Sequence, residues 1–234
     1  MSAFLAEHPI PRVVNELTEL KAAAQANLPE HSVIEIEPAA ILRRQIARRC
    51  IYGLDLNLMA VELARLGIWI HTFVPGLPMS ALDHGLRVGN SLTGIGTVDE
   101  ALAIFEPDAA HGQMSLFSGQ IDDALAAASD RLKRVALTSE ASKQDVHAAT
   151  REYVKAMQDA APAKRLLDAA VAVRLGQAAL PNSPEDADRI GQQSETADLI
   201  RTLQCAHMPL IFPEVFTRDA GGFDVILGNP PWDK

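Results

Sequence analysis

The sequence predicts an α/β fold in which an incomplete doubly wound parallel sheet carries a large helical insertion. Three observations support this class. Short apolar runs alternate with helical patterns between residues 50 and 88, the order expected of parallel strands joined by crossover helices. Residues 97–208 are rich in Ala, Leu, Gln and charged side chains, which favours helices. A last apolar run, residues 223–228, indicates another strand.

Two helices are expected before the first strand. The pattern over residues 2–28 is helical and places one apolar stripe on a single face, made by Val13, Val14, Leu17 and Leu20. Pro38 suits the first turn of the second helix, because its missing N–H has no partner there anyway. Ile41, Leu42 and Ile46 then form the inward side of that helix.

The start of the sheet follows directly. Residues 50–56 predict a central strand and residues 86–88 the next one. Asn57 is expected to cap the intervening helix, because an Asn side chain can accept hydrogen bonds from main-chain N–H groups of the first turn. The inner face of this helix is predicted to carry Met59, Leu63, Leu66 and Ile70.

The insertion is predicted to contain three or four helices, over residues 122–137, 142–160, 163–180 and 185–207. Breaks are expected at residues 138–139, at Pro162 and at residues 180–184, where Pro, Ser and Asn gather. Residues 112–119 are expected to form an exposed loop. The sequence shows no fixed internal repeat.

Composition limits the possible functions. No apolar run is long enough for a membrane span and no secretory leader is visible, so a cytoplasmic location without membrane association is expected. Cys50 and Cys205 match no metal or redox spacing, and no metal site is predicted. The net charge of −9 argues against this chain alone gripping duplex DNA. Its basic cluster, Arg43, Arg44, Arg48 and Arg49, is interpreted as a solvated helix face.

The most informative motif is Asn229-Pro230-Pro231-Trp232, directly after the predicted strand over residues 223–228. Two consecutive prolines cannot continue a sheet ladder, so the chain must form a stiff loop at the carboxyl end of that strand. Ligands of open α/β sheets bind at this edge. A loop with one amide, two proline carbonyls and one indole suits a planar ring that bears an amine. The alternative is a plain Pro-Pro turn with a core Trp.

This motif resembles the catalytic loop of amino-methyltransferases that use S-adenosylmethionine. The form with Asn and Trp is similar to the large bacterial DNA adenine-N6 methyltransferases of restriction–modification systems, including the type IIG-like enzymes that are fused to a nuclease. Residues 51–57, 86–92 and 207–216 resemble further stretches of the same family in the same order. The resemblance implies a Rossmann-like methyltransferase core with S-adenosylmethionine as cofactor and DNA as partner.

It also implies catalytic roles for the terminal loop. Asn229 Oδ1 and the Pro230 carbonyl would accept hydrogen bonds from the two amine hydrogens of adenine, with Pro231 holding the loop rigid. Trp232 would stack on a base that has left the duplex.

Two cofactor-binding residues follow from the resemblance. Asp55 would accept hydrogen bonds from the ribose of S-adenosylmethionine, and its alternative role is a charge favoured by a helix N-terminus. Asn90 would contact the adenine amine of the cofactor, although turn chemistry alone would also explain an Asn there.

The predicted organisation divides one core around the insertion. Residues 1–96 form the N-terminal helices and part of the α/β core, residues 97–208 the insertion, and residues 209–234 the catalytic strand and loop. The family's Gly-rich turn should precede Cys50, yet no glycine occurs before Gly53. The resemblance therefore implies a fragment or split subunit that is inactive in isolation. Its partners would be the remainder of the enzyme and DNA bound through other regions.

Two alternatives remain open. Enzymes that methylate a glutamine side chain of proteins, or guanine amines of RNA, use a similar loop. They should lack the long helical insertion. A helical interaction module with a vestigial motif is the non-enzymatic alternative.

Overall fold

The computed structural model describes residues 7–30, 34–79, 85–107, 116–137, 140–218 and 220–228. Its elements in chain order are α2 (Pro11–Ala26), α3 (Pro38–Cys50), β1 (Gly53–Asp55), α4 (Leu58–His71), β2 (Leu86–Val88), α5 (Val98–Phe105), α6 (Ser118–Leu137), α7 (Lys143–Asp159), α8 (Ala161–Arg174), α9 (Pro184–Gly191), α10 (Ser194–Leu203), α11 (Met208–Ile211) and α12 (Pro213–Phe216). None of these helices is long and apolar enough to cross a membrane.

The sheet within the described ranges is small and parallel. Gly53 pairs with Leu86 and Asp55 with Val88, and α4 forms the crossover between the two strands. This confirms the strand–helix–strand order predicted for residues 50–88, although β1 is shorter than expected. A third extended segment joins β2 through a parallel bridge between Asn90 and Cys205. The chain is thus a mixed α/β structure, and a complete doubly wound sheet stays a prediction.

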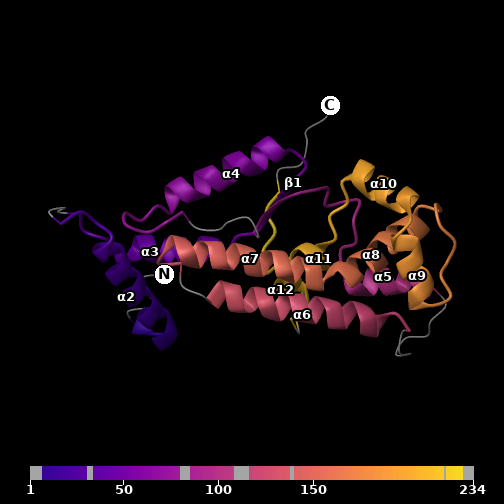
Figure 1. Cartoon of the computed structure of the whole chain (residues 1–234), viewed down its shortest axis with the longest axis horizontal. Helices are drawn as coiled ribbons and strands as arrows, with labels where there is room; N and C mark the ends of the chain where they lie inside the picture. The colour runs from indigo at the N-terminus through magenta and orange to yellow at the C-terminus, as the bar shows by residue number, and fades with distance from the viewer. Residues whose placement is uncertain are drawn as a thin grey trace.

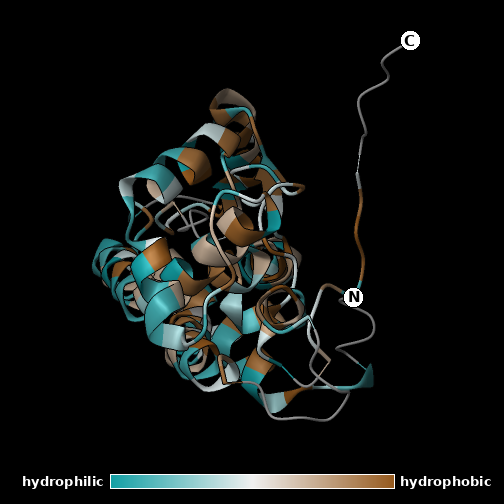
Figure 2. Cartoon of the chain, turned by 90° about the vertical axis from the view of Figure 1, so that its right-hand side faces the viewer, coloured by the Kyte–Doolittle hydropathy of each residue, from teal (hydrophilic) through white to brown (hydrophobic). Residues whose placement is uncertain are grey.

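The strand predicted for residues 223–228 is not present. Phe223 packs among Tyr52, Phe212 and Phe216, with ring centroids 5.5–5.7 Å away. Beyond it, Val225 is 75 % and Leu227 93 % exposed, and Figure 2 shows this brown segment standing apart from the helices. A strand needs a ladder partner, and none of the described segments supplies one. In the doubly wound strand order 3-2-1-4, β1 and β2 would take the places of strands 2 and 3, and residues 223–228 the place of strand 4. Strand 1 of that order would therefore lie between β1 and this segment.

Helix α4 faces the sheet with a different side from the one predicted. Met59, Leu63, Leu66 and Ile70 are 49–64 % exposed, so their assignment to the inner face was wrong. The core side instead carries Val61, which packs with Leu86 and the partly buried Ile68 and Trp69. The helix has two apolar faces, and a sheet of two short strands contacts only one of them. Asn57 Oδ1 accepts the Met59 N–H at 2.8 Å, which confirms the predicted cap.

Helix α3 begins at Pro38 as predicted, but of its four arginines only Arg43 is exposed, so the cluster does not form a solvated face. Arg44 is 1 % and Arg48 3 % exposed, because both lie on the helix face that packs against Glu140. Burial lowers the pKa of both guanidinium groups, against the opposing charge of Glu140. Arg49 pairs with Glu16 of α2 at 2.6 Å. This correction depends on a residue about ninety positions away in the chain.

The insertion contains more helices than predicted. Figure 1 shows α6 and α7 side by side along the long axis, with α8 and α9 beyond them. Predicted residues 122–137 and 142–160 correspond to α6 and α7, and α8 stops six residues short of the predicted end. The single helix predicted over residues 185–207 is broken into α9 and α10, and α5 was not foreseen. Residues 112–115 of the predicted loop and residues 138–139 lie outside the described residues, and helix α6 already begins at Ser118, inside the predicted loop.

The insertion has its own hydrophobic core. Buried residues between Ile95 and Leu210, among them Phe105, Leu125 and Leu167, form one cluster. A separate cluster joins α2 and α3 around Leu20 and Ile41, and a third holds α4 to β2. The boundaries at residues 96 and 208 stay a prediction, and the first cluster extends past both of them, to Ile95 and Leu210.

Candidate functional site

The candidate site lies at the carboxyl ends of β1 and β2. Because the two strands are parallel, Asp55 and the residues after Val88 lie at the same edge of the sheet. Asp55 ends β1 and is exposed, and Asn90 lies two residues beyond β2 and is half-buried. The structure therefore brings the two predicted cofactor-binding residues to one edge.

The Asp55 carboxylate has one oxygen engaged. Oδ1 accepts the Asn57 N–H at 2.7 Å, directly before α4. Oδ2 makes no hydrogen bond within the described part of the chain, so one carboxylate oxygen stays available to a ligand hydroxyl. Its position beside a helix N-terminus also fits the alternative role, because the helix dipole favours a negative charge there. The geometry permits both roles.

The main chain of Asn90 pairs with residues 204–206, and its side chain stabilises the turn that follows. Its N–H donates to the Gln204 carbonyl at 2.7 Å, and its carbonyl accepts the Ala206 N–H at 3.3 Å. Oδ1 accepts the Leu92 N–H at 3.0 Å, which is the turn chemistry anticipated from the sequence. The side-chain NH₂ makes no hydrogen bond to the described residues, so a donor remains for a ligand.

Residues 204–206 complete this edge, and the sequence analysis missed them. Gln204 adopts φ 50° in the left-handed region after α10, which turns the chain into the bridge with Asn90. A Gln carries no signal for this conformation, which Gly or Asn adopts far more readily. Two glycines after β2 pack closely on this segment: a Cβ on Gly89 would lie 2.8 Å from the Ala206 Cβ, and a Cβ on Gly94 would lie 2.0 Å from the Ala206 carbonyl oxygen.

The predicted catalytic residues Asn229, Pro230, Pro231 and Trp232 lie outside the described residues. The segment that leads to them is fixed only at its start, where the Phe223 ring contacts Tyr52. Tyr52 directly precedes β1, so this segment starts beside the amino end of that strand.

A buried carboxyl group lies in this aromatic cluster. Burial raises the pKa of Glu214 above its ordinary value, although hydrogen bonds from the main chain and from Tyr52 partly offset the rise. Burial and the nearby Glu214 charge raise the pKa of Tyr52. These groups lie at the amino end of β1, opposite to Asp55.

His207 and Cys205 do not form a metal site. His207 is 2 % exposed and its Nδ1 accepts the Ile95 N–H at 3.1 Å, so the proton sits on Nε2 and points at Asp168 Oδ1, 2.9 Å away. Cys205 Sγ lies 3.4 Å from the Thr93 carbonyl. Within the described ranges, no group of three or more His, Cys, Asp or Glu could hold a metal ion.

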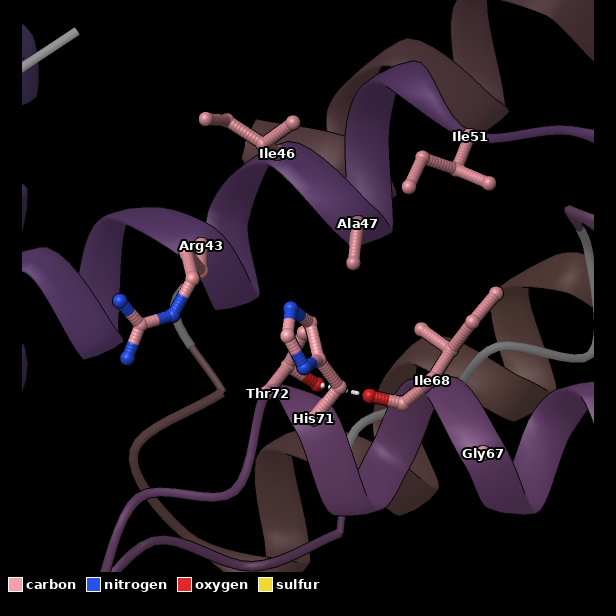
Figure 3. Close-up of a pocket in the computed structure, with 8 residues that line it drawn as sticks. All are labelled: Arg43, Ile46, Ala47, Ile51, Gly67, Ile68, His71 and Thr72. Atoms are coloured by element: carbon pink, nitrogen blue, oxygen red, sulfur yellow. Dashed lines mark hydrogen bonds between the residues drawn. The ribbon is translucent and has the colours of Figure 1, made fainter.

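A cleft of about 350 Å³ lies between α3 and α4, away from the carboxyl edge. Its walls are mainly apolar and include Ile46, Ala47 and Ile68. Figure 3 shows the His71 ring projecting from α4 toward Ala47, with Arg43 at the mouth of the cleft.

Comparison with known proteins gives one family. The model of the Eco57I restriction-modification methylase family matches residues 49–234, well over half of the chain. Neither the curated proteins nor the solved structures contain a significant match. The matched region begins at the end of α3 and includes both strands, the insertion and the terminal motif.

Proposed function

The chain belongs to the Eco57I restriction-modification methylase family, and from that membership we propose that it forms part of a DNA adenine-N6 methyltransferase whose methyl donor is S-adenosylmethionine. Membership makes the chain a restriction-modification methyltransferase. The cofactor, the N6 atom as acceptor and the residue roles are the proposal. The observation that carries it is the shared edge that holds Asp55 and Asn90.

The available polar groups at this edge fit the cofactor. Asp55 Oδ2 would accept a hydrogen bond from a ribose hydroxyl, and the Asn90 side chain would contact the adenine ring. S-Adenosylmethionine, when bound, supplies an electrophilic methyl group on a sulfonium. These two residues would hold only its nucleoside part, so the methionine part needs contacts from elsewhere.

The terminal motif would prepare the nucleophile. Adenine must leave the duplex, because its amine cannot be reached inside the base stack. The exocyclic nitrogen is a weak nucleophile because its lone pair is delocalised into the ring. Hydrogen bonds from its two hydrogens to Asn229 Oδ1 and the Pro230 carbonyl would favour a pyramidal nitrogen with a localised lone pair. Stacking on Trp232, worth about 1–3 kcal/mol, would offset much of the unstacking cost.

We further propose that the chain alone does not transfer methyl groups. Leu54 N–H and C=O point away from β2, because the register gives both ladder positions to Gly53 and Asp55. Within the described residues, no strand pairs with this edge of β1, and segment 224–228, which leads to the motif, is exposed. Weak cofactor binding and no turnover are the expected behaviour.

NMR titration tests the cofactor site even when binding is weak. S-Adenosylhomocysteine added to ¹⁵N-labelled chain should shift the amide signals of Asp55, Asn57 and Asn90. Asp55→Ala should weaken binding about ten- to hundredfold, because a hydrogen bond to a charged group contributes about 1.5–3 kcal/mol. Asp130→Ala is the matched control, since that carboxylate is exposed and makes no hydrogen bond. Shifts confined to other elements would contradict the assignment.

Methyl transfer tests the reaction. The protein expressed from its complete reading frame should transfer a tritiated methyl group to adenine N6 in unmethylated DNA, identified by mass spectrometry of the nucleosides. Asn229→Ala should reduce transfer by at least about a hundredfold. Trp232→Ala should reduce it by roughly five- to 150-fold, the factor that corresponds to about 1–3 kcal/mol of stacking. Transfer to RNA or to a protein glutamine would favour the other amino-methyltransferase classes. Unchanged activity in both variants would favour a vestigial motif.

A further inference from the structure

Helix α4 carries an apolar face that no described residue covers. This face, named here the α4 stripe, consists of Met59, Leu63, Leu66 and Ile70, exposed by 64 %, 60 %, 49 % and 62 %. Successive residues are four, three and four positions apart, and Leu56 and Phe73 extend the same spacing before and after the helix. Alternating steps of three and four are the pattern by which one helix packs along another.

The α4 stripe lies on a different face of the helix from the one that packs on the sheet. The helix already has a core contact through Val61, which is 4 % exposed and packs with Leu86. Arg65 anchors the same side, because it donates to the Leu86 carbonyl at 2.5 Å. A soluble helix needs one apolar face to pack on its core. A second apolar face with regular spacing therefore requires a separate explanation, and large exposed apolar surfaces mark interaction sites.

The cleft between α3 and α4 adjoins the stripe and gives it a preferred charge. Gly67 connects the two, since it follows Leu66 in α4 and lines the cleft, and a Cβ there would meet no atom within 4 Å. Arg43 and His71 lie at the cleft. Arg43 has no ion pair in the described part of the chain, although the net charge is −9. A local cationic flank on an acidic protein favours an acidic occupant.

A second copy of the chain fits this surface less well. Two copies that each carry a net charge of −9 repel one another. The stripe of a second copy also offers no free acidic side chain to Arg43, because Glu62, the one carboxylate of α4, pairs with Arg65. A different polypeptide can carry acidic residues at the required positions.

We propose that the α4 stripe and the adjoining cleft dock an amphipathic helix of a partner polypeptide, with apolar residues spaced by three and four and acidic residues facing Arg43 and His71. The apolar side chains of the partner would cover Leu63 and Leu66, and one of them would enter the cleft beside Gly67. This surface is distinct from the edge at Asp55, so the proposal does not depend on the methyltransferase assignment.

A designed peptide is the probe. It has about 21 residues, three heptads, with Leu at the apolar positions, Glu on both flanks and a fluorescent label. Like charges on its flanks keep it from pairing with itself. A second peptide carries Lys in place of Glu. Anisotropy titration of the full chain should give saturable binding of the Glu peptide. The Lys peptide should bind at least about tenfold more weakly, and added salt should lower the affinity of the chain for the Glu peptide.

Protein variants locate the site. Leu63→Lys combined with Leu66→Lys should weaken binding of the Glu peptide at least about tenfold. Arg43→Glu should reduce the ratio between the affinities of the Glu peptide and the Lys peptide. Leu180→Lys is the matched control, because Leu180 is 48 % exposed and lies outside α4. All these side chains face solvent, so circular dichroism should show unchanged folding. Equal binding of both peptides, or no binding, would overturn the proposal. The proposal would also be overturned if analytical ultracentrifugation showed that the unmodified chain is a homodimer and the double variant a monomer.

Discussion

Replacing Glu140 by Gln probes the ion cluster that holds α3 to the segment after α6. Glu140 is 1 % exposed, and its carboxylate lies 3.1 Å from Arg48 Nε and 3.5 Å from Arg44 Nη2. Gln keeps the size of the side chain and removes its charge. Arginine stays protonated in proteins, so both guanidinium charges would remain in a site that excludes water.

The expected cost is large for a single substitution. Removing one partner of a buried ion pair typically destabilises a protein by about 3–5 kcal/mol, because a buried charge loses its compensation. For a chain of this size, that corresponds to a fall in melting temperature of roughly 6–20 °C. Urea unfolding followed by circular dichroism gives the free energy directly, and a constant m value would show that the unfolded state is unchanged.

A surface ion pair provides the control. Glu62 is half exposed and pairs with Arg65 at 2.6 Å on one helix, so Glu62→Gln should cost only about 0.5 kcal/mol. If Glu140→Gln and Glu62→Gln destabilised the chain equally, the buried cluster would contribute no more than a solvated pair. That result would refute the reasoning.

Three further predictions concern packing, pH and the buried contact between Asp168 and His207. Gly67→Ala should stabilise the chain by about 0.5–1 kcal/mol, since its Cβ meets no atom within 4 Å. Gly191→Ala should destabilise it by about 1–3 kcal/mol, because its Cβ would lie 2.1 Å from a carbonyl oxygen; equal melting temperatures for the two variants would contradict the packing. Burial raises the pKa of Glu214 in the folded state, so the folded chain binds this proton more tightly and loses stability as pH rises above the ordinary 4.5. Glu214→Gln should therefore stabilise the chain increasingly as pH rises above 4.5, and a pH-independent difference in denaturant midpoint would argue against this sign. Asp168→Asn should lower the unfolding free energy by about 1.5–3 kcal/mol, because the His207 ring loses a charged acceptor at 2.9 Å; an unchanged urea midpoint would show that the contact contributes nothing.

Local signals in the sequence predicted local structure well. Pro38 marked the first turn of α3, Asn57 marked the cap of α4, and the run 86–88 gave β2 with its observed bounds. Each depends on residues within a few positions, where propensity and capping act directly. The two candidate cofactor-binding residues could be placed for the same reason, because Asp55 ends β1 and Asn90 follows β2, and both strands were predicted.

Features that depend on distant partners could not be predicted. The burial of Arg44 follows from Glu140, and the break before α10 follows from the close contact of Gly191 with the main chain of Arg165. Periodicity showed that α4 has an apolar stripe but not which face meets the sheet. The run 223–228 has the composition of a strand, yet a strand exists only where a neighbour completes its ladder.

The hydrogen bonds that join Asn90 to Gln204 and Ala206 bring the chain's departure from β2 and its return within one bridge of each other. The more than one hundred residues between these two neighbouring positions therefore begin and end at the same place beside β2, and they contain a hydrophobic core of their own. The insertion also contacts the core elsewhere, because Glu140 pairs with Arg44 and Arg48 of α3 and α6 packs against α12. Loop length has only a weak entropic cost, so changes in the insertion that keep these contacts would leave the edge that holds Asp55 undisturbed.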